Sequence, residues 1–183
     1  MQLTSSSFQH GMSIPRQFTC EGANISPELS WRDAPREAKS FALILHDSDA
    51  PRPGGFTHWV LYDIPSEVAS VEPKMPAQER IPGVGIQGKN DSGKIGYIGP
   101  CPPSGLHRYF VRLYALDLAE LKLPPGASKE QLEQAMRGHV LEQAELMGTY
   151  TKKPLGKPHN PLQQTWSFSS NACHTAPKRE CGL

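Results

Sequence analysis

Residues 41–46, Phe-Ala-Leu-Ile-Leu-His, decide the fold class because they form an unbroken apolar run that ends at a turn. A short continuous run bounded by turn-forming residues is typical of a β-strand buried on both faces. Two further strands are expected at residues 58–63, His-Trp-Val-Leu-Tyr-Asp, and 109–116, Tyr-Phe-Val-Arg-Leu-Tyr-Ala-Leu. A shorter strand is expected around Leu29 and Trp31. We therefore expect a mainly β protein.

The composition agrees with many short strands joined by turns. The 183 residues include 16 Gly and 18 Pro, about 19% of the chain against a usual 12% or so, which is too many breakers for a helix bundle. The length fits one domain. The net charge of +1 argues against a nucleic-acid protein that works through a strong basic field.

Neither a membrane span nor a signal peptide is expected. The chain has no run of 18 apolar residues, the approximate minimum for a transmembrane helix. Its first residues, MQLTSSSFQHG, lack the basic and apolar regions of a signal peptide. We therefore expect a cytoplasmic location.

One helix is expected in the last third of the domain. The sequence Ser-Lys-Glu-Gln at 128–131 matches a capping box, in which the first and fourth side chains satisfy free backbone N–H groups. Gly148 supplies a stop signal, and His139 would be a surface histidine inside this helix. The apolar residues that recur at helical spacing are Leu132, Met136, Val140, Ala144 and Met147.

The end of the chain differs in character from the rest. Three prolines oppose a regular element after residue 153, and residues 151–183 hold five Lys or Arg against one acidic residue. We expect a domain at 1–153 and a basic, proline-broken tail at 154–183. Trp166 and Phe168 are the tail residues that could anchor it to the domain or to a partner.

The four cysteines, Cys20, Cys101, Cys173 and Cys181, contain no C-x-x-C pair. In a cytoplasmic chain this pattern predicts four free thiols.

The G-x-G-x-x-G pattern at 83–88 does not indicate a dinucleotide site. That motif needs a strand before it and a helix after it, whereas Pro82 precedes this stretch and turn-forming residues follow it. No cofactor is therefore expected.

Polar side chains gather at three expected strand ends, in residues 46–51, 56–59 and 97–109. One sheet could bring them together into a small pocket of two carboxylates, two histidines and a tyrosine, with residues 100–103, Pro-Cys-Pro-Pro, as a rigid apolar wall. Histidine and tyrosine can donate to an oxyanion, which suits a phosphate monoester or a zwitterionic head group.

Three other interpretations of these residues remain open. They could bind a metal, although they include no i, i+4 ligand pair. They could form a hydrolase site with Ser104, although no G-x-S-x-G motif is present. They could also be structural polar groups that hydrogen-bond one another.

Four ordered motifs make the chain similar to a known family. They are CEGANISPELSW at 20–31, DSDAP at 47–51, GGFTHWVLYDIP at 54–65 and GKNDSGKIGYIGPCPPSGLHRY at 88–109. With these motifs the chain resembles, over about residues 1–152, the phosphatidylethanolamine-binding proteins, also called Raf kinase inhibitor-like proteins, and most closely their bacterial branch.

The resemblance implies a fold and a site. The fold would be a large central β-sheet packed against a smaller sheet with Greek-key connections, plus one or two short helices. An anion pocket would lie at one end of the sheet. One departure is Ser48, where the family usually has proline, which should loosen that loop slightly. The pocket residues carried over by motif are Asp47, Asp49, His58, Gly99, Pro102, Pro103, His107 and Tyr109.

These residues and the resemblance together predict a function. We expect a non-enzymatic binding protein for a phosphorylated or anionic ligand, with no metal and no cofactor. His107 and His58 would donate to the anion, Tyr109 would add a hydroxyl contact, and Asp47 would orient a histidine. Binding should then weaken as the pH rises through the histidine pKa, about 6.5 when unperturbed.

Two alternative functions remain. The chain could inhibit a kinase or protease through a protein partner, or it could be an Asp/His-dependent hydrolase. The resemblance also implies a homodimer.

Overall fold

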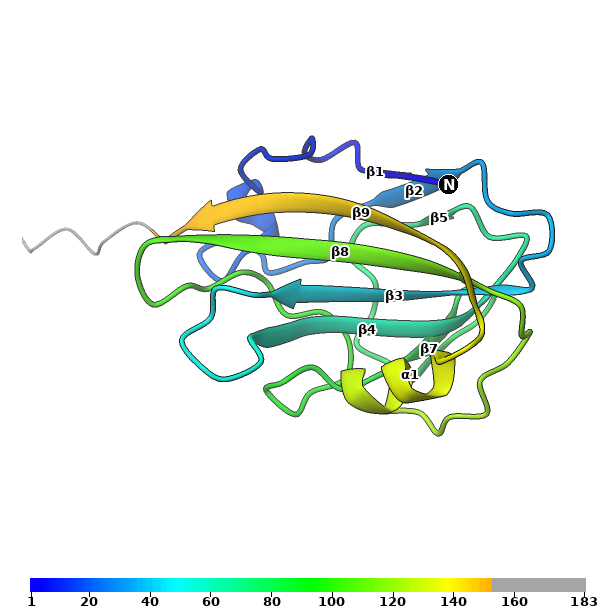
Figure 1. The fold of residues 1–183 in the computed structure, drawn as a ribbon. Coiled ribbons are helices and arrows are strands. Elements are labelled where there is room, and N and C mark those ends of the chain that lie inside the picture. Colours follow the sequence, from blue (N-terminus) through cyan, green and yellow to red (C-terminus); the bar gives the residue numbers. More distant parts are fainter. Residues whose placement is uncertain (153–183) are drawn as a thin grey trace, which may run out of the picture. The chain divides into compact units, whose positions relative to one another are not determined.

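The computed structural model describes residues 1–152, and they form two antiparallel β-sheets with one α-helix (Figure 1). The smaller sheet has the order β1-β2-β5, and the larger has the order β6-β7-β4-β3-β8-β9. The strands are β1 Gln2–Thr4, β2 Leu29–Arg32, β3 Ser40–Asp47, β4 Phe56–Pro65, β5 Ser70–Val71, β6 Arg80–Ile81, β7 Gly85–Gln87, β8 Leu106–Leu116 and β9 Val140–Thr151. The helix α1 spans Lys129–Met136, and a 3-10 turn, η1, spans Arg16–Phe18.

The apolar run at 41–46 forms the centre of the larger sheet, as its composition predicted. It lies in β3, where all eight residues are buried, between β4 and β8. Alternate residues of β3 face opposite sides. Phe41 and Leu43 join a core with the smaller sheet, whereas Ala42 and Ile44 join a core with α1. Burial on both faces explains why this strand contains no alternating polar residues.

The helix begins where the capping box predicts. The Ser128 hydroxyl accepts from the Gln131 backbone N–H at 3.3 Å, and the Gln131 side chain accepts from the Ser128 N–H at 2.9 Å. Leu132 and Met136 then bury their side chains against the sheet. These contacts cover the face of the sheet that the smaller sheet leaves uncovered.

The expected length of this helix was wrong, because it ends at Met136 and residues 140–151 form strand β9. Gly138 adopts a φ of 80°, a left-handed conformation that interrupts the helix. Beyond it the buried residues follow a period of two, which the helical reading missed: Ala144, Leu146, Gly148 and Tyr150.

Gly148 and His139 therefore lie outside the helix to which they were assigned. Gly148 lies inside β9, where an added Cβ would come within 2.9 Å of Ile14 and Phe8, so it allows the N-terminal segment to pack closely. His139 lies in the turn before β9, and its Nδ1 is 2.9 Å from Asp117 Oδ1.

The glycine pattern at 83–88 covers part of the turn between β6 and β7 and the whole of β7. The next element after β7 is strand β8, so the pattern does not open a helix as a dinucleotide-binding motif would. A Cβ on Gly85 would lie 2.6 Å from the Tyr62 carbonyl oxygen, so the glycine permits close strand packing.

Candidate functional site

The ends of three neighbouring strands meet at one end of the larger sheet. Asp47 is the last residue of β3 and pairs with Phe56 at the start of β4 and with Tyr109 near the start of β8. Because β3 is antiparallel to both neighbours, its end lies beside their beginnings. This brings His58 of β4 and His107 of β8 to either side of Asp47.

These strand ends and the loop before β8 enclose a cavity of about 280 Å³. One side of the cavity holds ionisable groups, and most of the remaining wall is apolar. Its lining residues are Asp47, Ala50, Pro51, Arg52, Phe56, His58, Ile98, Gly99, Cys101, Pro102, Pro103 and His107.

The structure places six of the eight expected site residues in this lining: Asp47, His58, Gly99, Pro102, Pro103 and His107. Asp49 and Tyr109 do not line it.

Asp47 orients His107 by a hydrogen bond. The His107 Nδ1 lies 2.7 Å from Asp47 Oδ2, so the ring donates its Nδ1–H to the carboxylate. The other carboxylate oxygen, Oδ1, accepts from the Asp49 backbone N–H at 2.8 Å. Both residues are buried, with 3% of Asp47 and 6% of His107 exposed. The pair therefore fixes which nitrogen of His107 remains for a ligand, namely Nε2.

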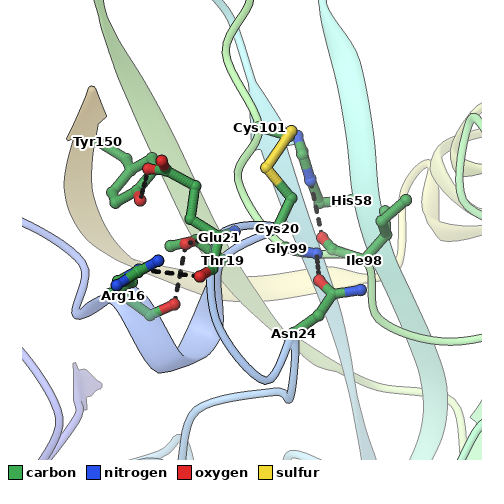
Figure 2. Close-up of a disulfide and its surroundings, with 10 residues drawn as sticks. All are labelled: Arg16, Thr19, Cys20, Glu21, Asn24, His58, Ile98, Gly99, Cys101 and Tyr150. Atoms are coloured by element: carbon green, nitrogen blue, oxygen red, sulfur yellow. Dashed lines mark hydrogen bonds between the residues drawn. A yellow bond between two sulfur atoms is a disulfide. The ribbon is translucent and has the colours of Figure 1, made fainter. Parts of the chain in front are cut away.

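His58 is held by a different kind of partner. Its Nδ1 lies 2.8 Å from the carbonyl oxygen of Ile98 in the facing loop, and Figure 2 shows this contact. Its ring packs against the Phe56 ring at 4.8 Å and against the edge of Tyr109 at 5.2 Å. Burial lowers the pKa of His58 to about 4 because the apolar surroundings disfavour the charged ring.

Asp49 contacts Arg108 instead of the cavity. Its carboxylate accepts from Arg108 Nε at 2.9 Å, from Nη2 at 2.7 Å and from the Arg108 backbone N–H at 2.9 Å. The hydrogen bonds from Arg108 lower the pKa of Asp49 to about 2. This bidentate pair ties the loop after β3 to the start of β8 and so fixes the cavity rim.

Tyr109 lies beneath the site rather than on its surface. It is fully buried, with its ring stacked 6.5 Å from the His107 ring. Burial, together with the nearby Asp47 carboxylate, raises its pKa. Tyr109 therefore supports both histidine rings from below.

Sequence reasoning missed the residues that complete the lining, notably Arg52, Phe56 and Ile98. Arg52 supplies a half-exposed cation at the rim, with its guanidinium 5.5 Å from the Phe56 ring centre and its Nη2 3.4 Å from Asp91 Oδ2. Two features of the sequence could have indicated these residues. Arg52 directly follows the DSDAP motif, and Phe56 begins the strand that contains His58.

The prediction of four free thiols was wrong for two of the cysteines. Cys20 and Cys101 form a disulfide with a Cα–Cα distance of 5.4 Å, although 81 positions separate them (Figure 2). Spacing along the chain gave no sign of this, because the fold brings the turn after η1 to the cavity wall. Disulfides are rare in reducing compartments, so the pairing weighs against the cytoplasmic expectation. Cys173 and Cys181 lie outside the described residues.

The disulfide is one of several links between that turn and the cavity wall. The Gly99 N–H donates to the Asn24 side chain at 2.7 Å (Figure 2). The Cys20 N–H donates to the Pro100 carbonyl at 3.1 Å. A Cβ on Gly99 would lie 2.3 Å from the Phe18 carbonyl oxygen. Gly99 therefore allows the wall to lie directly against the turn.

Residues 1–152 contain no group of three or more His, Cys, Asp or Glu side chains that could hold a metal ion. In the same part of the chain, no helix is long and apolar enough to span a membrane.

Comparisons with known proteins agree on one family. Residues 4–151 match the sequence profile described as phosphatidylethanolamine-binding protein. A UPF0098 protein of Methanothermobacter thermautotrophicus is 53% identical over 152 residues, which cover 83% of this chain and 99% of that protein. A UPF0098 protein of Aquifex aeolicus is 47% identical, over 83% of this chain and 89% of that one.

Two solved structures have the same fold. The crystal structure of a putative phosphatidylethanolamine-binding protein homologue from Chlamydia trachomatis has a TM-score of 0.76 and 45% sequence identity, covering 83% of this chain and 97% of that chain. The structure of YbcL from E. coli, described as a member of the mammalian PEBP family, has a TM-score of 0.77 and 30% identity, covering 83% and 98%.

Proposed function

Because the chain belongs to the phosphatidylethanolamine-binding protein family, we propose that it is a non-enzymatic binding protein whose cavity takes a phosphate-like anion, such as a phosphorylated head group. The observation that carries this proposal is the pair of buried histidines on either side of Asp47, each with its Nδ1 already engaged. Each ring thus keeps one nitrogen, Nε2, for a ligand in a cavity of about 280 Å³.

The charges of the site support an anion. A protonated His107 can donate from Nε2 while its Nδ1 stays paired with Asp47. Arg52 adds a permanent positive charge at the rim, only partly engaged by Asp91 at 3.4 Å. Charge-assisted donors of this kind suit phosphate oxygens.

The apolar part of the lining supports a ligand with an organic portion. Pro51, Phe56, Ile98, Pro102 and Pro103 supply carbon surface beside the ionisable groups. Proline has no N–H, so this side of the cavity offers few donors that an anion could use. A phosphate monoester would place its phosphate at the histidines and its organic group against this wall.

The lining also supports binding rather than turnover. Among the described residues that line the cavity there is no serine, threonine or lysine, and its single sulfur belongs to a disulfide. Both oxygens of Asp47 are already engaged. Hydroxyl, thiol and amine side chains, which commonly serve as nucleophiles in covalent catalysis, are therefore absent from this lining.

The proposal is tested by calorimetric titration of the full chain with phosphoethanolamine and with inorganic phosphate. The key variant is His107→Ala, and the matched control is His139→Ala, which removes a second His–Asp pair, with Nδ1 2.9 Å from Asp117, outside the cavity. We expect saturable binding by the wild type and the control, and at least tenfold weaker binding by His107→Ala. No binding by the wild type, or equal binding by His107→Ala, would overturn the proposal.

A further inference from the structure

We propose that His58 presents a hydrogen-bond acceptor to the cavity, and that it makes the site select oxyanions that carry a proton, such as dihydrogen phosphate or a phosphate monoester monoanion, over sulfate. This inference rests on the proposed function, because it concerns the same cavity. It replaces the expectation from sequence that His58 donates to the anion.

The contact with Ile98 decides which nitrogen of His58 carries the hydrogen. The Nδ1 lies 2.8 Å from a backbone carbonyl oxygen, and a carbonyl oxygen can only accept. The hydrogen must therefore be on Nδ1. A neutral imidazole has one N–H, so Nε2 holds a lone pair. No hydrogen bond among the described residues reaches that Nε2, and the ring lines the cavity.

The surroundings of the ring keep it neutral. His58 is 4% exposed, and it packs between the rings of Phe56 and Tyr109. Burial lowers its pKa to about 4, and this outweighs the opposing effects of the Ile98 contact and of the Asp47 and Asp91 carboxylates. The ionisable groups around it on β3, β8 and the adjoining loops are His46, Asp47, Arg52, Asp91, His107 and Tyr109.

The two histidines of the cavity thus differ in their chemistry. The Nδ1 of His107 faces a carboxylate, which can accompany a positive ring, so that His107 can donate from Nε2 when protonated. The Nδ1 of His58 faces an uncharged carbonyl in an apolar setting. A ligand that satisfies both rings must accept from one and donate to the other.

The protonation state of the ligand then decides its affinity. Sulfate offers only lone pairs, so binding it would bury the His58 Nε2 against another acceptor and leave it without a hydrogen bond. Dihydrogen phosphate and a monoester monoanion each carry an O–H that can donate to Nε2. We expect this difference to be at least tenfold in affinity.

The experiment is calorimetric titration of the wild-type chain at pH 5.5 with inorganic phosphate, phosphoethanolamine and sulfate. Both phosphate ligands should bind at least tenfold more tightly than sulfate, although sulfate carries the larger negative charge. If sulfate bound within threefold of phosphate while His107→Ala still abolished binding, the inference would be overturned and the proposed function would stand. If no anion bound, the proposed function itself would fail, and the inference with it.

A second measurement needs no variant. Long-range proton–nitrogen NMR of the histidine rings distinguishes a protonated ring nitrogen from a bare one. For His58 at pH 5.5 we expect hydrogen on Nδ1 only; a doubly protonated ring would overturn the inference.

A variant of His58 tests whether this residue causes the preference for phosphate over sulfate. In His58→Gln the amide can turn either its oxygen or its NH₂ group to the ligand, so sulfate should bind within threefold of phosphate. His139→Gln is the control and should keep the wild-type preference. Circular dichroism checks that both variants fold; an unchanged preference in folded His58→Gln would contradict the proposal.

Discussion

The six-stranded sheet has a hollow at each end, and the smaller of the two is the one with buried ionisable side chains in its lining. The cavity at the end of β3 has a volume of about 280 Å³, whereas the hollow at the end of β4 has about 890 Å³. The larger one, here called the second hollow, is lined by Lys39, Asp63, Pro65, Glu67, Arg80, Ile81, Pro82, Gly83, Val84, Gly85, Ile86, Ala119, Glu120, Lys122, Leu123 and Pro124.

The difference lies in how the polar groups are held. In the cavity, Asp47, His58 and His107 are buried and each has a fixed partner at 2.7 to 2.8 Å. In the second hollow the charged groups are exposed except for half-buried Asp63, whose Oδ1 accepts from the Leu121 N–H at 2.8 Å. Charges surrounded by water contribute little to binding. We therefore place the proposed site by its fixed, buried polar groups and not by the volume of the hollow.

The largest expected effect is a loss of stability on removing the Cys20–Cys101 disulfide at the cavity wall. The double variant Cys20→Ser, Cys101→Ser should lower the free energy of unfolding by about 4 kcal/mol, because the 81-residue separation closes a long loop in the unfolded chain. Urea unfolding at pH 7.5 measures it. Dithiothreitol should destabilise the wild type similarly and leave the double variant unchanged. An unchanged urea midpoint in the double variant would show that the link adds no stability.

A smaller effect on the free energy of unfolding is expected when the pH is lowered. Unfolded His58 gains its proton near pH 6.5, whereas the folded ring gains it only near its lowered pKa of about 4. Between these values the unfolded state binds more protons, so stability falls as the pH falls from 6.5 to 4, by about 3 kcal/mol. The lowered pKa of His46 acts in the same direction.

Chemical unfolding at several pH values tests this effect. His58→Gln should flatten the curve between pH 6.5 and 4, and exposed His10→Gln should leave it unchanged. A wild-type curve that is flat over this range would show that His58 is not held neutral.

The smallest expected effect concerns Asp63 in the second hollow. Burial raises the pKa of Asp63, so its ionised form is disfavoured in the folded state above the unfolded pKa. Asn keeps the oxygen that accepts from Leu121 and tolerates the φ of 51° at this position. Asp63→Asn should therefore stabilise the protein at pH 7 by less than about 1 kcal/mol, with a smaller effect at pH 4.

Asp63→Asn also tests whether the second hollow takes part in phosphate binding. It should leave phosphate affinity unchanged, since Asp63 does not line the cavity. A thermal unfolding series and one titration check both points, and a tenfold loss of phosphate affinity would contradict the distinction drawn between the hollows.

The central strands could be predicted from the sequence because their pattern is local. A continuous apolar run at 41–46 can only be accommodated by burial on both faces, and β3 lies in the middle of the sheet for that reason. The capping box at Ser128 is equally local, since its two hydrogen bonds span three residues. The strand-end motifs also indicated six of the cavity-lining residues, among them His58 and His107.

Only the tertiary structure decided the features that depend on distant partners. Residues 140–151 carry both a helical and an alternating pattern, and pairing with β8 made them a strand. The disulfide and the bond from His58 to Ile98 join residues 81 and 40 positions apart. The pKa of a histidine and the nitrogen that holds its hydrogen depend on burial and on the partner atom. The sequence alone therefore indicated that Asp47, His58 and His107 gather at this end of the sheet, and the fold decided what each can donate or accept.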